Sequence, residues 1–288
     1  MSQKAFVLDA SALIYRAYFA SYKQLEYNQK HNLPPNNAIK LVCQMLKKIM
    51  QFQSYDYALV ALDSPYKTLR SGMYEDYKKN RKPMDEALVQ QLEPINELFH
   101  LLGLKTYVYP GYEADDLVGS FAALCNEHRI KIDVYSSDKD MLQLVNNWTD
   151  VHLFKTGVSV LQTNTISNFA SQNNQLTPAQ IIDFKALAGD SSDHLLGVKG
   201  IGKQTALQLL YDYHDLNNIY EQINVHPNGL RTKLINGKNS AYMCYDLARI
   251  KTDLLKDQPL HDFIVKTRRD DDLKEFLSKW KINFSFAD

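Results

Sequence analysis

Short apolar runs that end in a carboxylate open the chain and alternate with amphipathic stretches. Residues 5–8 form an apolar run that stops at Asp9, and residues 57–62 form a second one that stops at Asp63. Uninterrupted runs of this length are typical of strands that are buried on both faces of a parallel sheet. Between the two runs, the apolar residues of 39–52 recur at helical spacing. The pattern predicts two parallel strands joined by a crossover helix.

The same alternation continues downstream. Residues 88–102 have helical periodicity, 105–109 form a third strand candidate, and 114–129 are again helical. A fourth strand is predicted at 132–135, followed by one helical turn at 141–145. The order of these elements predicts an α/β fold with a parallel sheet.

The second half of the chain is predicted to be helical. Thr177 and Pro178 are suited to the N-cap and the first position of a helix, and this helix should stop at Gly189. No convincing alternating strand pattern follows. We therefore expect an α/β core over residues 1–170 and a helical lobe over 171–288, built closely on that core.

Acidic residues gather where the predicted strands and helices meet. Because the carboxyl ends of parallel strands share one edge of a sheet, these acids should converge there. Taken singly, each is explained as well by a helix cap, a charge favoured at a helix N-terminus, or a solvated loop. The nine residues are Asp9, Asp63, Glu113, Asp115, Asp116, Asp138, Asp140, Asp190 and Asp193.

Taken together, these carboxylates predict a metal site. Acids crowded at one edge repel each other strongly unless cations lie between them or some stay protonated. Oxygen ligands without Cys or His favour Mg²⁺ or Mn²⁺, and the number of acids suggests two ions. Two divalent ions about 4 Å apart stabilise the attacking and leaving oxygens of a phosphoryl displacement. The predicted chemistry is phosphodiester hydrolysis, and no GxxxxGK[ST] loop indicates a nucleotide-driven motor or kinase.

A glycine-rich segment at 197–206, GVKGIGKQTA, opens a helix at its end. Gly200 and Gly202 allow close approach of a backbone, so that exposed N–H groups and Lys203 can bind a DNA phosphate, with carbonyls available for a monovalent cation. An ordinary glycine turn between two helices explains the same residues about as well.

A basic segment with interleaved tyrosines spans residues 69–83. Its cations could neutralise phosphates while its aromatic rings stack on unpaired bases, although most such charge runs are simply solvated. Its place directly after Asp63 suggests that it overhangs the acidic edge. The candidates for DNA contact are Arg70, Tyr77, Lys78, Lys79, Arg81 and Lys82, with Arg16 and Tyr15 as further candidates after Asp9.

Composition refines this interpretation. The 288 residues include 45% hydrophobic ones, enough for a substantial core, and three scattered cysteines that support neither a disulfide framework nor a zinc site. No membrane-length apolar run or signal-peptide pattern is present, so we expect a cytoplasmic protein.

The charges of the 33 acidic and 33 basic residues cancel, so that the formal net charge is zero. If nine acids bind metal, the remaining 24 face 33 basic residues, which leaves a positively charged surface suited to nucleic acid.

Six motifs closely resemble, in order, those of the 5′ nuclease domain of bacterial DNA polymerase I, related phage 5′ nucleases and, more distantly, flap endonucleases. They are LDASALIYRAYFA, VALDSPYKTLR, YKKNR, GYEADD, SSDKDMLQL and AGDSSDHLLGVKGIGKQTA. The resemblance runs from about Phe6 to Asp253. It implies a PIN-like α/β fold with a helical arch at about 70–100 and a helix-hairpin-helix motif at about 190–212. It also implies divalent-metal-dependent removal of 5′ ends and 5′ flaps from DNA, including RNA primers.

The resemblance also implies roles for the candidate residues. Asp9, Asp63, Glu113 and Asp115 would surround one metal, and Asp116, Asp138, Asp140, Asp190 and Asp193 would bind the second directly or through water, with Asp115 between the two ions. Lys78 and Arg81 would engage the scissile phosphate, and Tyr77 the unpaired base. Residues Val198, Lys199, Gly200, Ile201, Gly202 and Lys203 would grip the downstream duplex, with K⁺ as a further cation.

The sequence departs from the family pattern at three positions. His194 and Leu196 stand where the family usually has Asn and Pro, and Leu69 stands where an aromatic residue often precedes the arginine. Because the chain stops at Asp288, without a polymerase, we expect a monomeric nuclease that meets any polymerase partner in trans. Two other functions use the same features: a catalytically idle binder of DNA junctions, and a PIN-type ribonuclease.

Overall fold

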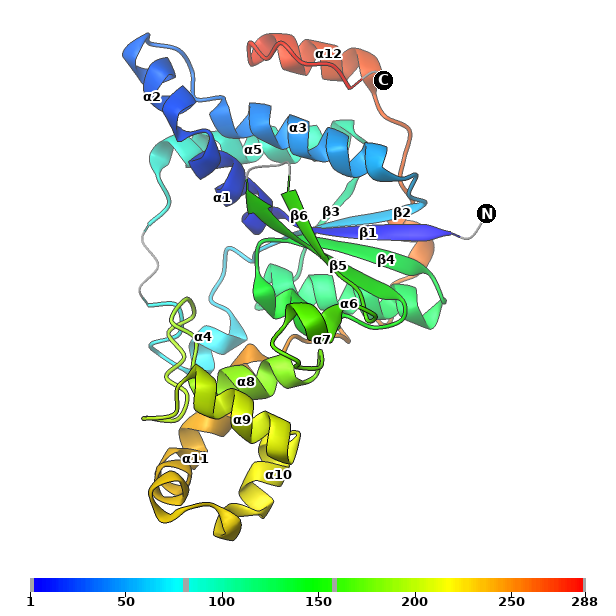
Figure 1. The fold of residues 1–288 in the computed structure, drawn as a ribbon. Helices are drawn as coiled ribbons and strands as arrows, with labels where there is room; N and C mark the ends of the chain where they lie inside the picture. Colours follow the sequence, from blue (N-terminus) through cyan, green and yellow to red (C-terminus); the bar gives the residue numbers. More distant parts are fainter. Residues whose placement is uncertain (1–2, 80–82, 157–159, 287–288) are drawn as a thin grey trace.

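A six-stranded sheet forms the centre of the protein, described here by a computed structural model that covers residues 3–79, 83–156 and 160–286 (Figure 1). The strand order is β3-β2-β1-β4-β5-β6. All neighbouring strands are parallel except β5 and β6, which are antiparallel. The strands are β1 (Lys4–Asp9), β2 (Tyr57–Leu62), β3 (Lys105–Val108), β4 (Lys131–Ser136), β5 (Thr149–Thr156) and β6 (Val160–Asn164).

Helices cover both faces of the sheet and form a lobe beside it. The α-helices before the lobe are α1 (Ala10–Ala20), α2 (Tyr22–Lys30), α3 (Asn37–Phe52), α4 (Leu69–Met73), α5 (Glu86–Leu101), α6 (Ala114–Glu127) and α7 (Phe169–Gln172). Those that follow are α8 (Gln180–Ala188), α9 (Lys203–Tyr213), α10 (Leu216–Glu221), α11 (Asn228–Ala248) and α12 (Asp270–Lys279). Three 3₁₀ helices are η1 (Lys139–Leu144), η2 (Ile223–Val225) and η3 (Leu260–Phe263).

The apolar runs of the central strands are explained by burial on both faces. In β1, Ala5 and Val7 pack with α6 and with the helical lobe. Phe6 and Leu8 point the other way, into a cluster built with α1, α3, α5 and α12. Figure 1 shows α3 and α5 on one side of the sheet and α6 on the other. Because the cluster on the α6 side continues into α8, α9 and α11, the lobe and the sheet share one hydrophobic core.

The predicted α/β architecture is confirmed, with differences at its edges. Strands β1 to β4 lie within one or two residues of the predicted ranges, and α8 ends at Gly189, whose φ of 76° suits glycine. The turn predicted as helix at 141–145 is the 3₁₀ helix η1. Helices α1, α2 and α7 and strands β5 and β6 lie in segments for which no element is predicted from the sequence.

The chain returns to the sheet after the helical lobe. The Val265 amide donates to the carbonyl of Asp56, and the Lys266 amide donates to that of Gly103 at 3.0 Å. Gly103 has a φ of 77°, and a Cβ atom there would lie 2.1 Å from the Lys266 carbonyl oxygen. This crossing leads to α12, whose Leu273 and Phe276 pack into the core beside α5. Among the described helices, none has the length and apolar character needed to cross a membrane.

Candidate active site

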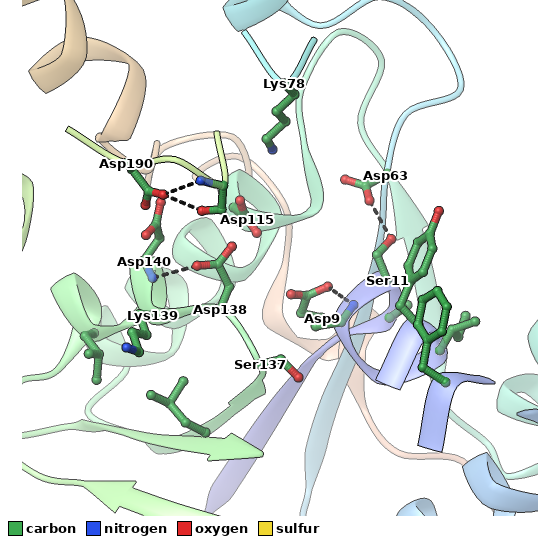
Figure 2. Close-up of a pocket in the computed structure, with 18 of the residues that line it drawn as sticks. Asp9, Ser11, Asp63, Lys78, Asp115, Ser137, Asp138, Lys139, Asp140 and Asp190 are labelled. Atoms are coloured by element: carbon green, nitrogen blue, oxygen red, sulfur yellow. Dashed lines mark hydrogen bonds between the residues drawn. The ribbon is translucent and has the colours of Figure 1, made fainter. Parts of the chain in front are cut away.

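A large pocket opens at the carboxyl ends of β1, β2 and β4, between the sheet and the helical lobe. It has a volume of about 2070 Å³. Figure 2 shows carboxylates pointing into it from several separate elements. Six of the nine predicted acids line this pocket: Asp9, Asp63, Asp115, Asp138, Asp140 and Asp190. The prediction that acids from distant parts of the sequence meet at one sheet edge is therefore confirmed for these six.

Two of these carboxylates are fixed where β1 and β2 end. Asp9 is 4% exposed and accepts hydrogen bonds from the Ala12 amide at 2.9 Å and the Ser136 hydroxyl at 2.7 Å. Asp63 accepts from the Ser11 hydroxyl at 2.5 Å and from the Ala114 amide at 2.9 Å. Asp9 caps α1 and Asp63 binds the first residue of α6, so strand ends and helix starts orient both side chains.

A second group of carboxylates lies on the η1 side of the pocket. Asp138 accepts from the Asp140 amide at 2.9 Å, and its own amide donates to the Ser136 hydroxyl. Asp140 is buried and forms an ion pair with Lys185. Asp190, in the loop after α8, pairs with the same lysine at 2.5 Å and accepts from the Ser192 amide. These three candidate ligands thus come from the β4–η1 connection, from η1 and from the loop after α8.

The remaining three acids are engaged elsewhere. Asp116 accepts two hydrogen bonds from Arg70, at 2.6 and 2.7 Å, and another from the Lys251 amide. Glu113 accepts from Arg70, from the Tyr77 hydroxyl and from Lys78. Asp193 lies near Lys78, with Oδ1 4.0 Å from the lysine Nζ. Both oxygens of Asp116 accept from Arg70, whereas the three donors to Glu113 all bind its Oε2. The metal-binding roles of Glu113, Asp116 and Asp193 stay predictions.

Arg70 and Tyr77, both predicted to contact DNA, are buried in this structure. Arg70 is 8% exposed, and its guanidinium also donates to the carbonyls of Leu247 and Arg249. Tyr77 is equally buried, at 8%, and packs in a small cluster with residues of α11. Arg70 and Tyr77 thus anchor the basic segment to α6 and α11, whereas Lys79 is exposed.

Among the described residues of this segment, Lys78 is the cation that reaches the pocket. It lines the cavity, adopts a φ of 56°, and donates to Glu113 at 2.9 Å. Figure 2 shows its side chain directed toward the acids. Lys79 is exposed and pairs with Asp76 at 2.6 Å.

The other predicted DNA-contact side chains outside the hairpin have different environments. Arg16 is half-buried and donates to the Ser137 hydroxyl at 2.9 Å and to the Lys155 carbonyl at 3.1 Å. Tyr15 is 37% exposed and lines the pocket. Arg81 and Lys82 lie outside the described residues.

The glycine-rich hairpin is held by one face of α11. Val198 and Ile201 are buried in the core, whereas Lys199, Gly202 and Lys203 are exposed, and Lys203 reaches the pocket. The α11 residues that contact the hairpin recur at helical spacing: Lys233 donates to the Gly200 carbonyl, Gly237 makes room for Val198, Ser240 donates to the Gly197 carbonyl, and Cys244 accepts from the Gly197 amide. Gly200 has a φ of 83°. The tight turn predicted at the glycines is present, and its binding of a phosphate stays a prediction.

The two substitutions before the hairpin occupy different environments. His194 adopts a φ of 58°, in the left-handed region where Asn is favoured and His is tolerated better than most residues. Leu196 is 65% exposed.

Burial and mutual repulsion shift the titration of the pocket acids. Burial raises the pKa of Asp9 to about 6, despite the hydrogen bonds that it accepts, and nearby Asp63 and Asp138 raise it further. Burial raises the pKa of Asp140 to about 7 even though Lys185 opposes the shift. The pKa of Asp115 is also raised, first by burial and then by Asp138 and Asp9. Without a cation among them, these groups cannot all ionise readily.

The donor set fits hard divalent cations. Within 3–79, 83–156 and 160–286, no three His, Cys, Asp or Glu side chains form a ready-made metal site. The six pocket acids nevertheless supply only oxygen donors, and their raised pKa values show that added positive charge would stabilise their ionised forms. Together, the fold and the pocket define an α/β protein with an all-carboxylate candidate active site.

The chain belongs to the 5′-3′ exonuclease family, and the protein is a nuclease. Residues 4–177 match the family described as "5'-3' exonuclease, N-terminal resolvase-like domain", and residues 176–271 match "5'-3' exonuclease, C-terminal SAM fold". A 5'-3' exonuclease of Mycoplasma genitalium is 40% identical over 281 residues, covering 98% of this chain and 97% of the relative. A DNA polymerase I of Lactococcus lactis is 34% identical over 276 residues, or 95% of this chain and 31% of that protein.

Solved structures share the fold at low sequence identity. A zinc-bound T5 5'-exonuclease aligns with a TM-score of 0.68 and 18% identity, covering 97% of this chain and 98% of the other. The catalytic core of Rad2 in complex with a DNA substrate aligns with a TM-score of 0.63 and 18% identity, covering 97% and 87%. The overall fold is thus shared with both.

Sequence reasoning missed Lys185 and the supporting serines. Ser11 and Ser136 bind the carboxylates of Asp63 and Asp9, and Lys185 pairs with two further acids. A usable signal for Lys185 was its position within the largely apolar stretch 181–188, five residues before Asp190. A lysine in such a stretch requires a buried partner.

We predict that Arg70→Met destabilises the protein strongly. The substitution leaves the buried carboxylates of Asp116 and Glu113 without their main cation, which costs about 3–5 kcal/mol when one member of a buried pair is removed. Thermal unfolding should show a melting temperature lower by at least ~5 °C. Lys79→Met, which removes an exposed ion pair of the same segment, should change it little. Equal effects of both substitutions would contradict the anchoring role of Arg70.

We also predict that the metal-free protein loses stability as pH rises. The pKa values of Asp9 and Asp140, about 6 and about 7, lie above the ordinary aspartate value of 3.8, so the folded state binds protons that the unfolded chain releases. The contribution is complete below pH 4 and is lost between about pH 4 and 7, on the order of 1 kcal/mol per pH unit. Urea unfolding in EDTA should give a lower midpoint at pH 7.5 than at pH 5. Asp140→Asn should flatten this slope, and a midpoint that rises with pH would contradict the account.

Proposed function

We propose that the protein is a divalent-metal-dependent 5′-3′ exonuclease and 5′-flap endonuclease that hydrolyses DNA phosphodiesters. The observation that carries the proposal is the convergence of six carboxylates in one pocket beneath Lys78. The DNA complexes of T5 D15 flap endonuclease and Rad2 support DNA as the substrate. Relatives named DNA polymerase I support a role in processing 5′ ends during replication or repair, including RNA-primed strands, with a polymerase in trans.

The carboxylates divide into two groups that would each hold one Mg²⁺ or Mn²⁺. Asp9 and Asp63 would hold the first ion, and Asp138, Asp140 and Asp190 would hold the second. Asp115 projects from the start of α6 and would lie between them. When bound, two such ions lower the pKa of an attacking water and stabilise the charge of the displaced oxygen. Glu113 and Asp116 act in this proposal through Arg70 and Lys78, as anchors of the basic segment.

The chain's own residues would position the DNA. Lys78, at the mouth of the pocket, is placed to contact the scissile phosphate, and Arg81 is proposed to assist from the same segment. The exposed groups of the hairpin, Lys199, Gly202 and Lys203, would bind the backbone of the duplex, where each neutralised phosphate adds to the salt dependence of binding. Lys79, Lys82 and Arg16 remain proposed backbone contacts. K⁺ stays a proposed further cation at the hairpin carbonyls, of which that of Gly200 also accepts from Lys233.

The direct experiment uses a DNA duplex with a labelled 5′ flap, incubated with Mg²⁺ or with EDTA. Cleavage in Mg²⁺ alone supports the proposal, with mononucleotides indicating exonuclease activity and whole flaps indicating endonuclease activity. Junction binding without cleavage would favour the catalytically idle binder. Preferential cleavage of an RNA flap over a DNA flap would favour the ribonuclease.

We predict that Asp63→Ala lowers flap cleavage in Mg²⁺ by at least ~100-fold, since it removes a ligand of the first ion. DNA binding should be retained or tightened, because negative charge is lost from the pocket. The matched control is Asp271→Ala on α12, which removes an exposed carboxylate outside the pocket and should cleave at the normal rate. An Asp63→Ala protein that cleaves normally would overturn the assignment.

A further inference from the structure

A lysine is buried among the pocket acids. Lys185 lies in the last turn of α8, and the residue is only 9% exposed. Lysine is among the residues least often buried, because its ammonium loses hydration unless a partner compensates. Its burial here therefore requires a specific electrostatic environment.

That environment consists of two carboxylates from the group on the η1 side of the pocket. The Lys185 ammonium pairs with Asp140 of η1 and, at 2.5 Å, with Asp190 in the loop after α8. These two ion pairs supply the compensation that a buried ammonium requires. Lys185 links two elements that would otherwise present repelling charges to each other.

These are the same carboxylates that the proposed function assigns to the second divalent ion, and the inference rests on that assignment. We propose that Lys185 is the resident cation of the second metal position: its ammonium holds Asp140 and Asp190 together in the metal-free protein, and a divalent ion must displace it from at least one of them. Lys185 thereby sets the affinity of the second ion. It is a positioning residue.

Competition follows from charge and geometry. An ammonium contacts carboxylate oxygens at about 2.7–2.9 Å, whereas Mg²⁺ binds them at about 2.0–2.1 Å. A carboxylate oxygen that contacts the ammonium cannot also bind a divalent ion at the same side. Two positive charges a few ångströms apart also repel each other. The flexible four-carbon stem of lysine allows its ammonium to move away while α8 stays in place. The first group of acids contacts no lysine in this way among the described residues, so competition should affect one ion only.

The test is calorimetric titration of Mn²⁺ into the intact protein at pH 7.5, without DNA. Asp140→Ala removes a ligand of the second position and so identifies its binding event. Lys185→Met, which keeps an unbranched apolar stem one atom shorter and removes the charge, should tighten that event by at least threefold. Lys185→Arg, which keeps the charge and can bind both carboxylates in a fork, should weaken it by a similar factor.

Thermal unfolding in EDTA gives a second readout. The melting temperature of Lys185→Met should be lower than that of the wild type, and the rise produced by saturating Mn²⁺ should be larger. Lys131→Met is the matched control. Lys131 begins β4 and pairs with Asp150 of β5, and neither residue lines the pocket, so the substitution should leave the binding of both ions unchanged.

The outcomes separate this inference from the proposed function. If the wild type binds no Mn²⁺ at millimolar concentration, or Asp140→Ala removes no binding event, the proposed metal positions fail, and the role of Lys185 fails with them. If the second event is present but unchanged or weaker in Lys185→Met, the inference is overturned and the function stands. Should Lys185→Met not fold, Lys185→Arg decides alone: weaker binding supports displacement, and unchanged or tighter binding contradicts it.

Discussion

Electrostatic repulsion among buried carboxylates is the constraint on which the organisation of this nuclease depends. The fold brings acids to one edge of the sheet because parallel strands end there and the helices that follow begin there. Burial then makes their charge costly, as the raised pKa values of Asp9, Asp115 and Asp140 show. Every element around the pocket supplies compensation in the form of hydroxyl groups, helix amides or buried cations. The same unsatisfied charge is what gives the pocket its affinity for divalent ions in our account.

The cations of the protein divide this task between structure and chemistry. Arg70 neutralises Glu113 and Asp116 and is saturated by carbonyl acceptors, so it fixes the start of the basic segment against α6. Lys78 follows eight residues later, contacts the same Glu113 and lines the pocket. A buried ion pair thus positions a cation at the pocket mouth. Charged residues of one sequence segment consequently have different roles: Arg70 anchors the basic segment, whereas Lys78 lines the pocket.

The sequence predicts the core of this arrangement and not its details, for physical reasons. Apolar runs that end in aspartate predict β1 and β2 because burial on both faces excludes polar residues. Strands β5 and β6 form a hairpin at the edge of the sheet and are not predicted in this way. In β5, for example, Asp150, His152 and Lys155 interrupt the apolar run. Helical spacing places Glu113 and Asp116 on one face, yet only the fold determines that Arg70 lies opposite. Neither the anchoring of Tyr77 by Glu113 nor the pairing of Lys185 with Asp140 follows from local sequence, because each of these partners is distant along the chain.

The most direct test of the central claim is the anomalous X-ray scattering of Mn²⁺ in crystals of the protein soaked at pH 7.5. The account predicts two peaks in the pocket, one beside Asp9 and Asp63 and one beside Asp138, Asp140 and Asp190, with the Lys185 ammonium withdrawn from at least one carboxylate. The absence of both peaks from the pocket would contradict it.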